Sequence, residues 1–155
     1  MRGETEPKAP EMSHSILCVC LGNICRSPTG QAALARAMPG AVVDSAGTSG
    51  WHIGDAPYAP MQIAARAQGL DLGDQRARQV TARDFTRFDL ILAMDAQNLT
   101  DLQAIQPPGA TARLALYLEV LADGPRDVPD PYYTRDFAAV LTLIDRAARA
   151  WGARL

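Results

Sequence analysis

The chain has 155 residues, of which 48% are hydrophobic and 21% are charged, and its formal net charge at pH 7 is −2. This length and composition fit a single globular domain that needs neither disulfides nor a structural metal, and no basic patch points to a nucleic-acid partner. The apolar runs are too short for a membrane-spanning helix or a secretory signal, so we expect a cytoplasmic protein with no membrane partner.

The N-terminal stretch MRGETEPKAPEMSH contains charges and prolines but almost no apolar periodicity. Such a segment buries too little apolar surface to offset the entropy that is lost on ordering. We therefore expect residues 1–14 to form a disordered N-terminal extension and residues 15–155 to form one domain.

A strand, a loop and a helix are predicted to follow one another at the start of this domain. Residues 15–20, SILCVC, form a short apolar run that is typical of a buried parallel strand. After a loop at residues 21–26, Ser27 can act as the N-cap of a helix and Pro28 can occupy its first turn.

Three further apolar runs predict the rest of a sheet. They are AVVDSAG, FDLILAM and ARLALYL, at residues 41–47, 88–94 and 112–118. Because these runs show little alternation and are separated by helical segments, we expect an α/β fold in three layers, with a four-stranded parallel sheet flanked by helices.

Helical patterns cover residues 57–68 and 96–105, and residues 122–136, rich in Pro and Asp, are predicted to form a loop. A C-terminal helix is predicted from one apolar stripe with helical spacing. The stripe consists of Phe137, Val140, Leu141, Ile144, Ala148 and Trp151.

The loop between the first strand and its helix combines a thiol with a guanidinium. Its backbone N–H groups and the positive end of the helix dipole can bind an anion. The loop lacks the second glycine and the lysine of a nucleotide-binding P-loop, so a nucleotide site is not expected. A cysteine in such a position ionises more readily than an ordinary thiol, which makes Cys20 a candidate nucleophile. Arg26 can bind two oxygens of a phosphate, and Ser27 can donate a hydrogen bond to the thiolate.

The stretch VCLGNICRSP, at residues 19–28, resembles the signature loop of the low-molecular-weight protein tyrosine phosphatases. Four other stretches agree with this family in the same order, and the resemblance spans residues 15–155. These stretches are DSAGTSGWHIG, RARQ, AMD and DPYY, at residues 44–54, 76–79, 93–95 and 130–133.

The resemblance implies a flavodoxin-like phosphotyrosine phosphatase I fold and hydrolysis of phosphotyrosine and aryl phosphates. Cys20 would attack phosphorus to form a phosphocysteine, Arg26 would clamp the phosphate, and Asp130 would protonate the leaving group and then activate water. Asn23 would hold the shape of the loop, with Ser27 supporting the thiolate. The phosphate-binding residues would be Leu21, Gly22, Asn23, Ile24, Cys25 and Arg26.

Aromatic side chains are expected to form the walls of the substrate site. Pro131 restrains the backbone at Asp130, so that the acid is presented from a stiff loop, and Tyr132 and Tyr133 follow directly. Without its neighbours, this tyrosine pair would be interpreted as side chains that pack over the hydrophobic core beneath their loop. Beside the acid and the phosphate loop we interpret it as one wall, and the resemblance places Trp51 on the other.

The three cysteines lie between residues 18 and 25, too close together for a disulfide framework. Cys18 is expected to be a buried apolar residue. Cys25 contributes its backbone N–H to the loop, traps oxidised Cys20 as a disulfide, or does both, and the resemblance favours the redox role. No metal site is expected, because only His14 and His52 are left to complete one, and the resemblance implies no cofactor.

The chain departs from the family at two places. Gln75 stands where a histidine is common, which alters a hydrogen-bond link to the phosphate loop. Residues Ala56–Gln62 lack a common Asp-x-Arg, which affects the charge at the rim of the site and the choice of substrate.

Three other polar residues are given no role in catalysis. Arg76 and Arg78 are interpreted as a solvated loop pair, and Asp95 is interpreted as a helix cap and nothing more.

A monomer is the default expectation for the oligomeric state. The resemblance implies action on a phosphotyrosine-containing protein, with a bacterial tyrosine kinase as one candidate. Arsenate reductases with a similar loop use further cysteines downstream, and this chain has none after Cys25. Phosphoarginine hydrolysis goes with a small polar residue at the position of Ile24, so Ile24 favours phosphotyrosine. A binding module without catalysis stays an alternative until turnover of an aryl phosphate is measured.

Overall fold

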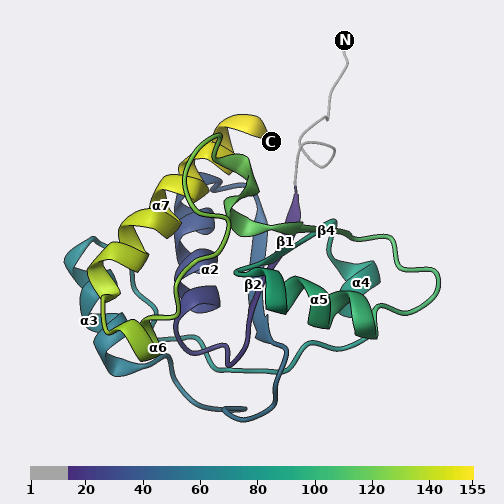
Figure 1. The fold of residues 1–155 in the computed structure, drawn as a ribbon, viewed down its shortest axis with the longest axis horizontal. Helices are drawn as coiled ribbons and strands as arrows, with labels where there is room; N and C mark the ends of the chain where they lie inside the picture. The colour runs from purple at the N-terminus through teal and green to yellow at the C-terminus, as the bar shows by residue number, and fades with distance from the viewer. Residues whose placement is uncertain (1–13) are drawn as a thin grey trace.

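Four parallel strands form one sheet at the centre of the computed structural model, which describes residues 14–155 (Figure 1). The strands are β1 (Ser15–Cys20), β2 (Val42–Gly47), β3 (Leu90–Ala93) and β4 (Arg113–Leu116), in the order β2-β1-β3-β4. The predicted sheet is therefore confirmed. The expected N-terminal extension, apart from His14, lies outside the described residues.

Helices cover both faces of this sheet (Figure 1). The group on one face comprises α2 (Arg26–Ala37), α3 (Ala59–Ala67) and α7 (Phe137–Arg154), and the group on the other comprises α4 (Asp84–Arg87) and α5 (Ala96–Ile105). Side chains of β1 alternate between the two resulting cores. Ile16 and Cys18 pack with the α2 and α7 side, whereas Leu17 and Val19 pack with the α4 and α5 side. The three-layer α/β fold is confirmed.

The C-terminal helix α7 buries the predicted apolar stripe except for Phe137, which is partly buried. Trp151 is 1% exposed, and its Nε1 donates a 2.8 Å hydrogen bond to the backbone oxygen of Tyr117. On α2, a Cβ at Gly30 would stand 2.5 Å from Met94 Cε, 3.2 Å from the ring of Tyr117 and 3.3 Å from Cys18 Sγ, so glycine avoids crowding where this helix meets the sheet. Among the residues from 14 onward, no helix is both long and apolar enough to cross a membrane.

Two local predictions were wrong. Helix α2 begins at Arg26 with Cys25 as its N-cap residue. Ser27 is not the cap, because its hydroxyl lies 3.1 Å from the sulfur of Cys20 instead. The predicted loop at residues 122–136 contains a short helix, α6 (Pro131–Thr134). Asp130 caps this helix by accepting a 3.0 Å hydrogen bond from the backbone N–H of Tyr132, and Pro131 fits its first position.

Candidate active site

Cys20 lies at the carboxyl end of β1, where ligands bind in open parallel sheets. Its side chain is 3% exposed, and its Sγ lies 3.1 Å from the hydroxyl of Ser27. The backbone N–H of Asn23 donates a 3.3 Å hydrogen bond to the same sulfur. Two donors can therefore hold negative charge on this sulfur.

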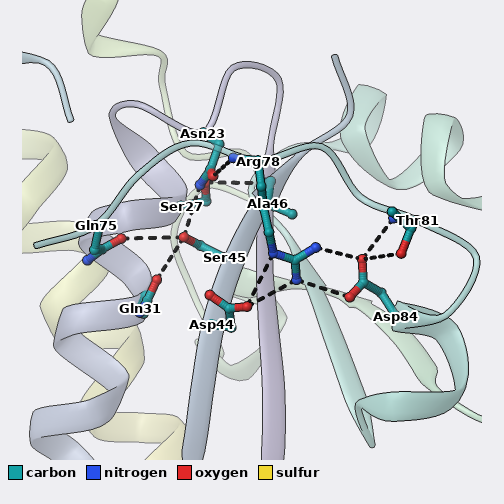
Figure 2. Close-up of polar contacts among 10 residues, drawn as sticks. All are labelled: Asn23, Ser27, Gln31, Asp44, Ser45, Ala46, Gln75, Arg78, Thr81 and Asp84. Atoms are coloured by element: carbon teal, nitrogen blue, oxygen red, sulfur yellow. Dashed lines mark hydrogen bonds and ion pairs between the residues drawn. The ribbon is translucent and has the colours of Figure 1, made fainter. Parts of the chain in front are cut away.

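Asn23 gives the loop its sharp turn. Its backbone adopts the left-handed conformation, with φ of 58°, which side chains other than Asn, Asp and Gly rarely tolerate. Its side-chain amide donates to the hydroxyls of Ser27 at 2.8 Å and Ser45 at 2.9 Å, and its Oδ1 accepts from the backbone N–H of Arg78 at 3.0 Å (Figure 2). This buried side chain thus ties the loop to β2 and to the segment around residue 78.

The carbonyl groups of the loop bond to the segment at residues 47–58. Backbone N–H groups of Thr48, Ser49 and Tyr58 donate to the oxygens of Cys20, Leu21 and Ile24 at 2.9, 3.0 and 2.8 Å. Gly47 makes room for this contact, because a Cβ there would lie 2.8 Å from the oxygen of Leu21. With these carbonyls directed away from the pocket, the loop presents its amide groups to an anion.

Arg26 is buried at the first position of α2, and three groups surround its guanidinium. Nη1 donates to Asp95 Oδ2 at 2.7 Å and to the backbone oxygen of Val128 at 3.0 Å, and Nη2 lies 3.6 Å from Asp130 Oδ2. Burial alone would lower the pKa of Arg26, but Cys20 and Asp95 outweigh it and raise that pKa. The guanidinium therefore stays charged between the thiol and the two carboxylates.

Asp95 does more than cap a helix. Its Oδ1 accepts a 2.7 Å hydrogen bond from the backbone N–H of Asn98, which confirms the predicted cap of α5. Its Oδ2 binds Arg26, so the interpretation as a cap and nothing more was wrong. The sequence placed Asp95 two residues after β3, at the same edge of the sheet as Cys20, but not the pairing of β1 with β3 that brings it to Arg26.

Cys20 and the loop form the floor of a pocket of about 250 Å³. Arg26 and Asp130 line it together with three aromatic residues that were predicted as walls: Trp51, Tyr132 and Tyr133. The indole of Trp51 is 73% exposed, so it stands at the rim. His52 also lines the pocket and was not predicted; its Nδ1 lies 3.2 Å from Asp55 Oδ2.

Most of the predicted loop residues reach the pocket, and two supporting residues do not. The lining includes Leu21, Gly22, Ile24 and Cys25. The side chains of Asn23 and Ser27 are buried on the other side of the loop from the pocket, where they bond to each other. The structure thus separates residues that can touch a ligand from residues that hold the loop.

The other two cysteines are buried near Cys20. Cys18 is fully buried, as predicted, and burial raises the pKa of its thiol far above the ordinary range. Burial, with a contribution from Cys20, raises the pKa of Cys25 to about 12. Both thiols are therefore neutral near pH 7.

Gln75 and Arg78 take part in the hydrogen bonds behind the loop (Figure 2). Gln75 Nε2 donates to the backbone oxygen of Pro28 at 3.0 Å, and its Oε1 lies 3.4 Å from the hydroxyl of Ser45, which donates to the nearer Gln31 Oε1 at 2.8 Å. An uncharged side chain thus provides a link at this position. Arg78 binds Asp44 and Asp84, so its interpretation as part of a solvated pair was wrong. No sequence signal joined these three residues.

Comparison with known proteins identifies the family. The model of the family "Low molecular weight phosphotyrosine protein phosphatase" matches residues 15–155. The chain is 42% identical over 137 residues to the low-molecular-weight protein-tyrosine-phosphatase YfkJ of Bacillus subtilis, covering 84% of this chain and 88% of that protein. It is 40% identical over 146 residues to Wzb of Salmonella typhi, covering 93% and 95% of the two chains.

Among solved structures, Wzb of Vibrio vulnificus in complex with benzylphosphonate superposes with a TM-score of 0.84. The match has 33% sequence identity and covers 92% of this chain and 99% of that chain. The chain therefore belongs to the low-molecular-weight protein tyrosine phosphatase family and is a protein-tyrosine phosphatase.

Proposed function

We propose that the chain hydrolyses phosphotyrosine and other aryl phosphates through a phosphocysteine intermediate. One observation carries this proposal: the thiol of Cys20, the guanidinium of Arg26 and the carboxyl group of Asp130 all line one pocket. A nucleophile, a cation for the phosphate oxygens and a proton donor are what this displacement at phosphorus needs.

In the first step, the thiolate of Cys20 attacks phosphorus and an S–P bond replaces the bond from phosphorus to the phenolic oxygen. Arg26 and the loop amides bind the phosphoryl oxygens, whose negative charge they neutralise. Asp130, 3.6 Å from Arg26 on the pocket lining, gives its proton to the leaving phenolate.

In the second step, water attacks the phosphocysteine. Asp130, now a carboxylate, accepts a proton from this water, the S–P bond breaks and inorganic phosphate leaves. The hydroxyl of Ser27, at 3.1 Å, and the backbone N–H of Asn23, at 3.3 Å, stabilise the returning thiolate. The cycle restores both groups and consumes one water.

The aromatic rim favours an aryl substrate. Trp51, Tyr132 and Tyr133 surround the entrance, and such side chains pack against a flat ring. The solved Vibrio vulnificus relative holds benzylphosphonate, which joins an aromatic ring to a phosphonate. A phosphotyrosine-containing protein is the proposed partner, and a bacterial tyrosine kinase is one candidate.

Hydrolysis of para-nitrophenyl phosphate, followed across pH for wild type and Cys20→Ser, tests this proposal. We expect turnover that resists a metal chelator and falls to background in the variant, because serine is a far weaker nucleophile than a thiolate. The variant should still bind inorganic phosphate, since its loop amides and Arg26 remain. Turnover by Cys20→Ser at the wild-type rate would refute the role of Cys20.

A further inference from the structure

Arg78 lies behind the phosphate loop, on a segment that pairs with the end of β2. The backbone N–H of Gly47 donates to the oxygen of Arg78 at 2.8 Å, and the N–H of Val80 donates back to Gly47 at 2.9 Å. Arg78 does not line the pocket. Any effect of this residue on a bound phosphate must therefore pass through its neighbours.

Two carboxylates hold the guanidinium of Arg78 (Figure 2). Nη1 and Nη2 bind the two oxygens of Asp84 at 3.0 Å each, and Nε and Nη2 bind Asp44 Oδ2 at 3.3 and 3.1 Å. The side chain of Asp84 is only 3% exposed, and Thr81 donates its backbone N–H to it at 2.8 Å. Arg78 is thus clamped between β2 and the first turn of α4.

The electrostatics of this ion cluster match its geometry. Burial would raise the pKa of Asp84, but the hydrogen bonds from Arg78 and Thr81 outweigh burial and lower that pKa. Asp84 is therefore ionised near neutral pH. A lysine at position 78 keeps the charge but lacks the planar fork that reaches two carboxylates at once.

The backbone of Arg78 connects this cluster to the reactive sulfur. Its N–H donates to Asn23 Oδ1 at 3.0 Å, and the backbone N–H of Asn23 donates to Cys20 Sγ at 3.3 Å. Asn23 holds a left-handed backbone, a conformation that persists only where neighbouring contacts fix it. The contact from Arg78 is one of three hydrogen bonds that fix its side chain.

We propose that Arg78 is a positioning residue for the phosphate loop. Asp44 and Asp84 hold the side chain of Arg78 and thereby fix the position of its backbone N–H. This N–H orients the side chain of Asn23, and Asn23 in turn orients the loop around Cys20. The proposal rests on the proposed phosphatase function for its kinetic readout, whereas binding of inorganic phosphate to the loop tests it without turnover.

The test is a double-mutant cycle between Arg78→Lys and Asn23→Ala, with Arg76→Lys as the matched control. Arg76 is exposed and donates only to the backbone oxygens of Gly73 and Gln75. We expect Arg78→Lys to lower kcat for para-nitrophenyl phosphate about tenfold or more, because small displacements of reacting groups cost rate steeply. We expect a several-fold loss of affinity for inorganic phosphate, measured by calorimetry, and wild-type behaviour from Arg76→Lys.

The cycle separates positioning from a purely structural role. If Arg78 acts through Asn23, the Arg78→Lys change will have little further effect on kcat or phosphate affinity in the Asn23→Ala background. Equal fold losses in both backgrounds would overturn the proposal, as would wild-type kinetics and phosphate affinity in Arg78→Lys. A variant that is merely less stable keeps its kcat per folded molecule at a temperature well below its midpoint of unfolding.

A milder variant keeps the test decisive if Arg78→Lys does not fold. Asp44→Asn leaves both bonds between Arg78 and Asp84 in place and removes a carboxylate that is 37% exposed. We expect it to lower kcat and phosphate affinity in the same direction but less. Unchanged values would contradict the proposal. If the wild type binds phosphate without turnover, the proposed function fails, and the binding measurements still decide the role of Arg78.

Discussion

Arg26 donates a 2.7 Å hydrogen bond to Asp95, and the second oxygen of that carboxylate caps helix α5. One side chain thus joins the guanidinium of Arg26 to the helix that follows β3. The same guanidinium lies 3.6 Å from Asp130, too far for a hydrogen bond. Asp95 therefore fixes the direction of Arg26, and Asp130 is left free to exchange its proton.

Replacing Asp95 by Asn separates these two roles. Asn caps a helix about as well as Asp, so we expect the free energy of unfolding to change little. With the amide oxygen kept on the cap, the amide nitrogen takes the place of Oδ2 and cannot accept the hydrogen bond from Arg26. A hydrogen bond to a charged group is worth about 1.5–3 kcal/mol, so kcat/KM should fall about ten- to hundredfold. Steady-state hydrolysis of para-nitrophenyl phosphate measures this. Asp101→Asn on the same helix is the control, and equal kcat/KM in wild type and Asp95→Asn would contradict the role given to Asp95.

The acid role of Asp130 predicts a dependence on the leaving group. Asp130→Asn retains a cap for α6 but has no proton to give, so phenols that leave poorly should lose about 10²–10⁴-fold in kcat. Phenols that leave readily need little protonation and should lose much less. A series of substituted phenyl phosphates gives the slope of log kcat against phenol pKa. The slope should steepen in the variant, and parallel lines for the two enzymes would exclude the acid role.

The sheet and its reactive edge could be predicted because their signals are local. Apolar runs mark β1 to β4, and Cys20 and Arg26 stand within seven positions of each other beside a helix start. The sequence predicted both a cap role and a contact with the sulfur for Ser27, and it could not show that only the contact with the sulfur is made. The orientation of this hydroxyl is set in three dimensions: the side-chain amide of Asn23 donates to its oxygen, which leaves its proton for the sulfur of Cys20.

The links between distant segments were beyond a single sequence. From the sequence, Arg78 is interpreted as a solvated loop residue. Its partner Asp44 lies 34 positions away, and its partner Asp84 lies on a four-residue helix that has no clear hydrophobic pattern. Asp95 and Arg26 are 69 positions apart, and only the meeting of β1 and β3 brings them together. Pairings of this kind follow from the register of the sheet.

The position of Cys25 beside the reactive thiol predicts protection against oxidation. Peroxide converts the Cys20 thiolate to a sulfenic acid, and the Cys25 thiol can condense with it to form a disulfide and release water. Dithiothreitol should restore most activity in the wild type but much less in Cys25→Ser, where further oxidation proceeds. Recovered activity after matched peroxide exposure measures this, with Cys18→Ser as the control. Equal recovery in wild type and Cys25→Ser would remove the redox role and leave Cys25 with its backbone alone.

The ion pair of Asp84 with Arg78 predicts how stability depends on pH. Because the pKa of Asp84 is lowered on folding, its contribution is present above the unfolded value of about 3.9 and is lost as pH falls through the folded value. Removing one partner of a fully buried ion pair costs about 3–5 kcal/mol. Asp84→Asn should destabilise the protein at pH 7 by less than this, because Arg78 still has Asp44 as a partner and is partly exposed. Urea unfolding measured from pH 7 to pH 3 gives the difference in the free energy of unfolding between wild type and Asp84→Asn. This difference should become smaller below pH 4, and the exposed Asp123→Asn serves as the control. A difference of constant size would mean that the charge of Asp84 contributes nothing and that its side chain matters only for packing.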